Sequence, residues 1–163
     1  MDIAHSFTPK PDNTRLLRDA FGKFATGVTV VTSDSGMAIT ANSFSSVSLT
    51  PALVLWSPGR HSSRFEHFVK ARHYAIHILA ADQHDICWAV AKDKGAISEI
   101  ATGHNAQGVP VFDGCLARFD CELRAVHDAG DHAIVVGEVL QATMTDGEPL
   151  AFYQGKMSRI GQH

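Results

Sequence analysis

A run of uncharged polar side chains lies between two apolar segments in the first third of the chain. Between Ile39 and Ser48 it supplies hydroxyl or amide groups at Thr40, Asn42, Ser43, Ser45, Ser46 and Ser48. Neutral donors and acceptors of this kind can hold a heteroaromatic ring at fixed hydrogen-bond positions. The same hydroxyls could instead satisfy backbone groups at an irregular strand end, and composition leaves both interpretations open.

A second candidate segment, residues 57–64, reads Ser-Pro-Gly-Arg-His-Ser-Ser-Arg and stands just before a predicted amphipathic helix. The free N–H groups of a helix N-terminus bind anions, and Arg60 or Arg64 could add charge-assisted hydrogen bonds to a phosphate. Alternatively, Ser62 or Ser63 simply caps the helix and the arginines are solvated.

A third candidate is the turn Gly130-Asp131-His132, which leads into an apolar strand and which we pair with the segment 153–156, Tyr-Gln-Gly-Lys. A histidine and a lysine placed there could orient a dinucleotide. As the alternative, they are turn residues at the rim of a barrel.

The sequence predicts no metal site. His73 and His77 share one face of a predicted strand, but no carboxylate or thiolate stands at a spacing that would complete a ligand set. Cys87, Cys115 and Cys121 are odd in number and lack paired spacings, so we predict buried, reduced thiols. No P-loop or Gly-x-Gly-x-x-Gly fingerprint occurs.

Composition predicts one ordinary globular domain spanning residues 1–163, with residues 1–12 as a flexible tail. The chain is 45% hydrophobic and 19% charged, with a formal net charge of -3, which argues against a nucleic-acid partner. The N-terminus carries no signal or transit peptide pattern, and no segment is apolar enough to cross a bilayer. We therefore expect a cytoplasmic protein without membrane contact.

Periodicity predicts a mainly β fold with a few short helices, most simply a closed barrel. Strands are expected at residues 28–32, 38–43, 52–56, 74–79, 116–126, 133–143 and 150–153, with the 52–56 strand buried on both faces and Asp146-Gly147 as a hairpin turn. Helices are expected from Asp12-Asn13-Thr14 to Gly27 with Leu17, Phe21 and Phe24 inside, around Phe65, Phe68 and Val69, from Asp82 through Val90, and briefly at residues 96–101 within a mobile loop, 92–105.

Five segments together resemble a known family. They are residues 24–32 (Phe-Ala-Thr-Gly-Val-Thr-Val-Val-Thr), 39–48 (Ile-Thr-Ala-Asn-Ser-Phe-Ser-Ser-Val-Ser), 51–57 (Pro-Ala-Leu-Val-Leu-Trp-Ser), 130–132 (Gly-Asp-His) and 152–155 (Phe-Tyr-Gln-Gly). In this order they are similar to the flavin reductase family with the FMN-binding split-barrel fold, the reductase components of two-component flavin monooxygenases. The similarity runs from about residue 16 to residue 161.

The resemblance implies a split β-barrel of Greek-key type with short peripheral helices, which forms a homodimer with flavin sites near the subunit interface. It implies hydride transfer from NADH, or NADPH, to FMN or FAD, and release of the reduced flavin to a separate monooxygenase. Whether FMN or FAD is preferred, and whether the flavin is a substrate or a bound group, stays open.

The resemblance also assigns roles to residues. Ile39, Thr40, Ala41, Asn42 and Ser43 correspond to the strand along the flavin ring edge, and Ser45 and Ser46 to the bend after it; Ser57 and Pro58 correspond to ribityl contacts, and Ser62, Ser63 and Arg64 to phosphate contacts; His132, Tyr153, Gln154, Gly155 and Lys156 correspond to the nicotinamide side. Because hydride passes directly between stacked rings, we expect His132 to orient the nicotinamide or relay a proton.

Three positions depart from the family pattern by lacking an aromatic side chain. They are Gly95, the pair Ala89-Val90, and Met157, and their loss puts a mobile cover over the pocket in doubt. Alternatives are therefore a non-catalytic flavin-binding protein or a flavin-dependent reductase of a metal chelate or other acceptor. A pyridoxal-phosphate-related split-barrel oxidase is a further alternative, which the absence of a richer basic phosphate cluster counts against.

Overall fold

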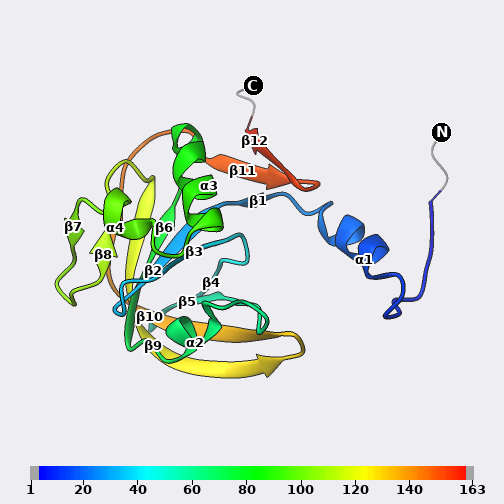
Figure 1. Cartoon of the computed structure of the whole chain (residues 1–163), viewed down its shortest axis with the longest axis horizontal. Helices are drawn as coiled ribbons and strands as arrows, with labels where there is room; N and C mark the ends of the chain where they lie inside the picture. The colour runs from blue at the N-terminus through cyan, green and yellow to red at the C-terminus, as the bar shows by residue number, and fades with distance from the viewer. Residues whose placement is uncertain (1–3, 161–163) are drawn as a thin grey trace.

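A seven-stranded antiparallel sheet forms the centre of the computed structural model, which describes residues 4–160 (Figure 1). Its strand order is β3-β2-β6-β9-β10-β5-β4. The strands are β2 (Thr29–Ser33), β3 (Ala38–Ala41), β4 (Ser45–Leu49), β5 (Ala52–Trp56), β6 (His73–Ile78), β9 (Ala117–Ala129) and β10 (His132–Met144). The two edge strands, β3 and β4, are joined by three residues only, so the sheet must curl until its edges approach each other. The barrel is split between them, since β3 and β4 are not hydrogen-bonded neighbours.

Short elements surround this sheet. A three-stranded sheet contains β1 (Thr26–Gly27), β11 (Leu150–Tyr153) and β12 (Lys156–Arg159), and β7 (Gly103–His104) pairs with β8 (Pro110–Val111). The helices are α1 (Thr14–Phe21), α2 (Phe65–Val69), α3 (His84–Lys92) and α4 (Ile97–Ile100), with the 3-10 turn η1 (Ala81–Gln83) before α3. The predicted mainly β fold with a few short helices is thus confirmed.

The core has two halves because β2 alternates its side chains between the two faces of the sheet. Val31 points into the barrel and packs in a cluster with Trp56, Phe68 and Tyr74. The ring of Phe68, from α2, meets Trp56 edge to face at 5.2 Å. Val30 belongs instead to the cluster beneath α3, whose buried members also include Ala38, Cys87, Val90 and Leu150. This cluster beneath α3 packs α3 against β3.

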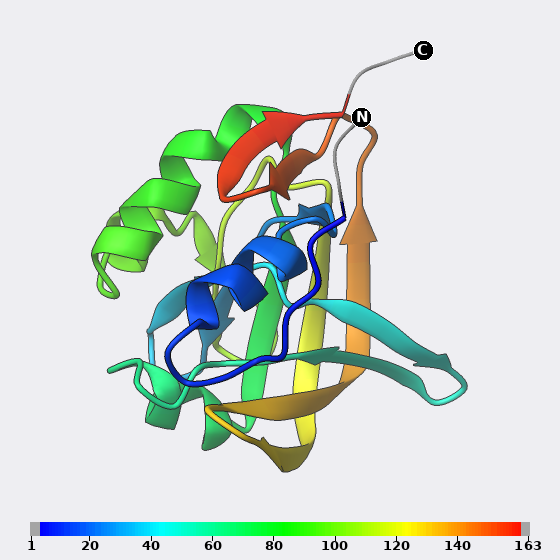
Figure 2. The same ribbon diagram turned by 90° about the vertical axis from the view of Figure 1, so that its right-hand side faces the viewer.

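Helix α1 stands apart from this core. It projects to one side in Figure 1 and lies in front of the sheet in Figure 2, and none of its residues is buried. The prediction of a longer helix reaching Gly27 was wrong, because α1 ends at Phe21 and residues 26–27 form β1 instead. Phe24 therefore lies outside any helix and is 79% exposed. Leu17 and Phe21 lie in the helix that their spacing predicts, whereas Phe24, which continues the same spacing, follows the helix.

Several other boundaries differ from prediction. Ser45 and Ser46 begin strand β4 rather than forming a bend. The strand β5 buries only Val54 and Trp56, so it is covered on one face and not on both. Helices α2 and α3 begin after the predicted serine and aspartate caps, and Asp82 belongs to η1.

The hairpin predicted at Asp146-Gly147 is not formed, because β10 does not pair with β11. Instead, β11 pairs with β12 across the turn Gln154-Gly155. Both turn residues have positive φ, 49° and 75°, as a tight two-residue hairpin turn requires. The short helix at residues 97–100 falls within the predicted range 96–101.

At the N-terminus, residues 1–3 of the predicted tail lie outside the described residues, and residues 4–13 form no helix or strand. Within residues 4–160, no helix has the length and apolar character needed to span a membrane.

Candidate functional site

Two pockets near strand β3 contain eight of the seventeen predicted site residues. The first, which we call the Ser62 pocket, has a volume of about 350 Å³ and is lined by Ile39, Thr40, Ser62, Ser63, Arg64 and Ala91. It brings the predicted ring-edge strand and the predicted phosphate segment together, although they are more than twenty residues apart in the chain. The Ser62 Oγ accepts a hydrogen bond from the Arg64 backbone N–H at 3.2 Å, which shapes the turn before α2.

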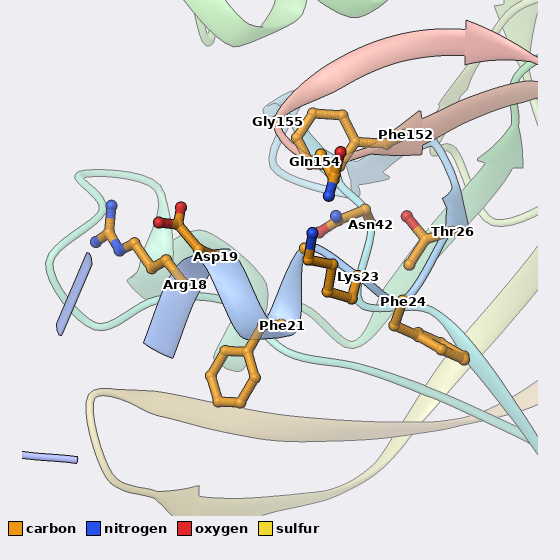
Figure 3. A pocket seen from close by; sticks show the side chains of 11 residues that line it. Arg18, Asp19, Phe21, Lys23, Phe24, Thr26, Asn42, Phe152, Gln154 and Gly155 are labelled. Atoms are coloured by element: carbon orange, nitrogen blue, oxygen red, sulfur yellow. The ribbon is translucent and has the colours of Figure 1, made fainter. Parts of the chain in front are cut away.

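The second pocket, which we call the α1 pocket, lies beyond the end of β3 and has a volume of about 750 Å³ (Figure 3). Its lining residues are Arg18, Asp19, Phe21, Gly22, Lys23, Phe24, Thr26, Asn42, Phe152, Gln154 and Gly155. Asn42 was predicted on the flavin side, and Gln154 and Gly155 on the nicotinamide side. The structure brings these two predicted groups together around one cavity.

The hydroxyl groups of the Ile39–Ser48 run mostly satisfy backbone atoms. Thr40 Oγ1 donates to the carbonyl of Cys87 in α3 at 2.9 Å. Ser43 Oγ accepts from the Ser57 backbone N–H at 2.9 Å, and Ser45 Oγ donates to Ser46 O at 3.1 Å. The backbone alternative was therefore right for these three side chains. Asn42 differs, because its exposed amide makes no hydrogen bond to the described residues and points into the α1 pocket (Figure 3).

Both candidate phosphate arginines are engaged by the protein itself. The Arg64 guanidinium donates to the carbonyls of Ala38, Val90 and Ala91 at 3.2, 2.7 and 3.2 Å. It therefore joins β3 to the last turn of α3, and its partial burial lowers the pKa of Arg64. Arg60 forms an ion pair with Asp128 and donates from Nε to Gly130 O at 3.1 Å.

The turn that carries His132 contacts the 57–60 loop, not the segment 153–156 with which we paired it. Ala133 N donates to Pro58 O, Arg60 N donates to Asp131 O, and His132 forms a β-bridge with Gly59. His132 Nδ1 lies 2.7 Å from an Asp131 carboxylate oxygen, and this hydrogen bond lowers the pKa of Asp131. Because an ionised carboxylate only accepts hydrogen bonds, Nδ1 is the protonated nitrogen. His132 thus adjoins the predicted ribityl segment, Ser57-Pro58.

The Tyr153–Lys156 segment contacts the end of α1 instead. Gln154 N donates to Gly22 O at 3.0 Å, which closes one wall of the α1 pocket. Tyr153 and Lys156 do not line that pocket.

Sequence reasoning predicted only Asn42, Gln154 and Gly155 in the α1 pocket and missed its other eight lining residues, among them Lys23, Thr26 and Phe152. Lys23 precedes the family segment 24–32, and Thr26 belongs to it. Because a helix was expected over this stretch, neither residue was predicted to face a pocket. Thr26 Oγ1 is buried and has no hydrogen-bond partner among residues 4–160, so the wall of the pocket retains an unused polar group. No short-range pattern would have brought Phe152 to Asn42.

The histidine pair does not form a metal site. His77 is fully buried, with Nδ1 3.0 Å from the carbonyl of Val30, and its ring stacks on Phe112 at 4.1 Å. His73 Nε2 lies 3.5 Å from Glu122. Nowhere in the described part of the chain do three or more metal-binding side chains gather. The three cysteines are free, and Cys87 and Cys121 are buried as predicted, whereas Cys115 is half-buried.

Comparisons with known proteins identify the family of the chain. Residues 21–161 match the family described as flavin reductase like domain. The chain is 48% identical over 165 residues to the FMN reductase (NADH) SmoA of Agrobacterium fabrum, a match covering 99% of this chain and 95% of that protein. It is 44% identical to the reductase component of flavin-dependent trigonelline monooxygenase of Acinetobacter baylyi, over 86% of this chain and 47% of that protein, so it matches about half the length of that relative.

A solved structure also has a similar fold. The NADH:FAD oxidoreductase SgcE6 of Streptomyces globisporus C-1027 superposes with a TM-score of 0.89 at 31% identity. The superposition covers 99% of this chain and 96% of that one.

Proposed function

The chain belongs to the flavin reductase like domain family, and from this premise we propose that it transfers a hydride from NADH to FMN or FAD and supplies reduced flavin to a separate monooxygenase. The observation that carries the proposal is the pair of pockets along β3. One is lined by small hydroxyl side chains and the other by amides and aromatic rings. Together they match the two ends of a flavin nucleotide, a phosphorylated chain and a planar heterocycle.

The groups in the two pockets fit a flavin in chemistry as well as in position. Asn42 and Gln154 present amides, which both donate and accept hydrogen bonds, as the alternating carbonyl and N–H groups of a flavin edge require. Thr26 Oγ1 adds a buried hydroxyl with no protein partner. Ser62 and Ser63 offer hydroxyl donors at the other end. Arg64 supports this end by holding α3, whose Ala91 forms part of the pocket.

The protein contributes position and electrostatics to the reaction. The flavin supplies the hydride acceptor, and stacking of the two rings makes transfer effectively unimolecular. His132, with Nδ1–H fixed on Asp131, keeps Nε2 as a hydrogen-bond acceptor when the ring is neutral. We assign it to the orientation of the nicotinamide, next to the Ser57–Pro58 segment.

The active form is a homodimer. Large apolar side chains are exposed at the end of α1, just after it and on the edge strand β4, with Phe21 68%, Phe24 79% and Leu49 96% exposed. Amphipathic helices in water normally bury their apolar side, whereas α1 has no buried residue. Phe21 and Phe24 also line the α1 pocket, so a second copy that covers them would place the site at the interface. Sedimentation velocity should give twice the chain mass for the native protein and the chain mass for Phe21→Ser/Phe24→Ser; a native monomer would contradict the dimer.

An anaerobic assay tests the activity. NADH added to the protein with free FMN should bleach the flavin absorbance faster than the reaction without protein. Repeating it with FAD and NADPH ranks both substrates. A rate equal to the control would reject the reductase and leave a non-catalytic flavin-binding protein. Retention of yellow colour through gel filtration would instead indicate a bound flavin that reduces another acceptor.

A further inference from the structure

Three polar side chains point into the same part of the α1 pocket. Figure 3 shows the ends of Lys23, Asn42 and Gln154 directed toward one another, from three segments that are far apart in the chain. Asp19 also lines the pocket, but its carboxylate points away from this group (Figure 3). Lys23 forms no ion pair with any residue of the described chain. The Lys23 ammonium group is therefore unpaired among the described residues, although Arg18 and Asp19 also line the pocket.

The backbone fixes the place of this charge. Lys23 N donates to Ala20 O at 3.1 Å, and Phe24 N donates to Phe21 O at 3.1 Å, so the chain turns tightly as it leaves α1. The bond from Gln154 N to Gly22 O, at 3.0 Å, ties this turn to the β11–β12 hairpin. Lys23 is therefore held between two anchored segments, and its side chain enters the cavity at Asn42, the residue after β3.

The chemistry of the three groups favours a flavin ring over a phosphate. Asn42 and Gln154 each carry a carbonyl oxygen, which a phosphate could not use because all of its exposed atoms are acceptors. A flavin edge has both N–H and carbonyl groups and can pair with an amide in full. Phe24 and Phe152 line the same pocket and provide apolar walls suited to a planar ring.

We propose that the Lys23 ammonium group binds the pyrimidine side of the flavin ring and favours its reduced form over its oxidised form. The inference rests on the proposed function. Hydride transfer delivers two electrons and one proton, so the ring becomes negatively charged until a second proton arrives. A cation beside the ring offsets that charge, and it has no comparable effect on the neutral oxidised ring. Lys23 thereby increases the driving force for reduction without taking or giving a proton.

Binding of the two redox forms tests this role without any need for turnover. The dissociation constants of oxidised FMN and dithionite-reduced FMN are measured anaerobically for the full-length native protein, Lys23→Met and Lys23→Arg. Arg15→Met is the control, because Arg15 is an exposed cation on α1 that does not line the pocket. We expect Lys23→Met to weaken the binding of reduced FMN about tenfold more than that of oxidised FMN, and Lys23→Arg to restore most of the difference.

Other outcomes overturn the inference. Equal weakening of both redox forms in Lys23→Met would place Lys23 at a phosphate or in a purely steric role. An equal selective loss in Arg15→Met would show a general effect of net charge. A native protein that binds neither form would also reject it. Failure of the proposed function appears separately, as native protein that binds reduced FMN selectively but does not bleach FMN with NADH.

Discussion

Replacement of Arg64 by methionine separates two roles that this arginine could have. Three hydrogen bonds from its guanidinium reach carbonyls of β3 and of the last turn of α3, where helix carbonyls lack partners within the helix. A hydrogen bond from a charged donor stabilises a folded protein by about 1.5–3 kcal/mol when buried. Because the Arg64 side chain is only half-buried, we expect a loss of about 2–3 kcal/mol in total for Arg64→Met.

Urea unfolding measured by tryptophan fluorescence reports this loss, since Trp56 is fully buried in the barrel. The matched control is Arg60→Met, which loses the ion pair with the exposed carboxylate of Asp128 and one hydrogen bond to Gly130 O. An exposed ion pair contributes about 1 kcal/mol or less. A loss in Arg64→Met no larger than that in Arg60→Met would refute the role of Arg64 as the link between β3 and α3.

Ligand binding completes the separation. If Arg64 acts by holding α3, its replacement should weaken FMN and riboflavin by similar factors, because Ala91 and the shape of the Ser62 pocket change for both. If Arg64 contacts the phosphate, FMN should weaken and riboflavin, which has no phosphate, should not. Weaker binding of FMN alone, together with unchanged stability, would show that Arg64 binds the phosphate group.

Three further predictions concern the core and the nicotinamide side. Gly137→Ala should lower the free energy of unfolding by about 2 kcal/mol or more in the same urea assay, because the added Cβ would lie 1.9 Å from the Tyr74 hydroxyl oxygen. Adding Tyr74→Phe to this variant should recover part of the loss, and an unchanged stability of Gly137→Ala would contradict this packing. His132→Ala should lower kcat/KM for NADH about tenfold and leave FMN affinity within about twofold, and an unchanged NADH rate would remove His132 from the reaction. Burial lowers the pKa of His77 to about 4, whereas the same side chain in the unfolded chain titrates near 6.5. Because the unfolded state binds more protons below pH 6.5, the free energy of unfolding should fall by up to roughly 3 kcal/mol between pH 6.5 and 4 and level off below. A His77 imidazole that titrates near 6.5 by NMR in the folded protein would refute this.

The strands of the barrel could be predicted because their side chains alternate or branch at Cβ. The runs that became β2, β6, β9 and β10 all fell within a few residues of their expected ranges. Pairing was harder to predict. Asp146-Gly147 marks a change of chain direction, but a turn dipeptide does not specify which strand follows beside which. In the structure β11 joins β1, which was hidden inside the helix expected around Phe24.

The site was predictable where its residues lie on one strand and much less so where it depends on distant segments. Thr40 lies on β3 and Asn42 directly follows it, so one short segment supplies a residue to each of the two pockets. Lys23 reaches Asn42 only because the β11–β12 turn binds the end of α1, a contact between residues 22 and 154. Likewise, hydroxyl composition could not show that Thr40 would donate to α3, since its acceptor is the carbonyl of Cys87.

The structure also shows where two of the three positions that lack a family aromatic side chain are located. Val90 is fully buried in the cluster beneath α3, and Met157 packs against the same cluster from β12. Neither position lines either pocket, so smaller or aliphatic residues there alter the packing of α3 and not a cover over the site. Gly95 is different, because it is exposed just after α3, where its N–H donates to Asp93 at 2.8 Å. The sequence departures at Val90 and Met157 therefore give little reason to expect slow turnover, and Gly95 also lines neither pocket.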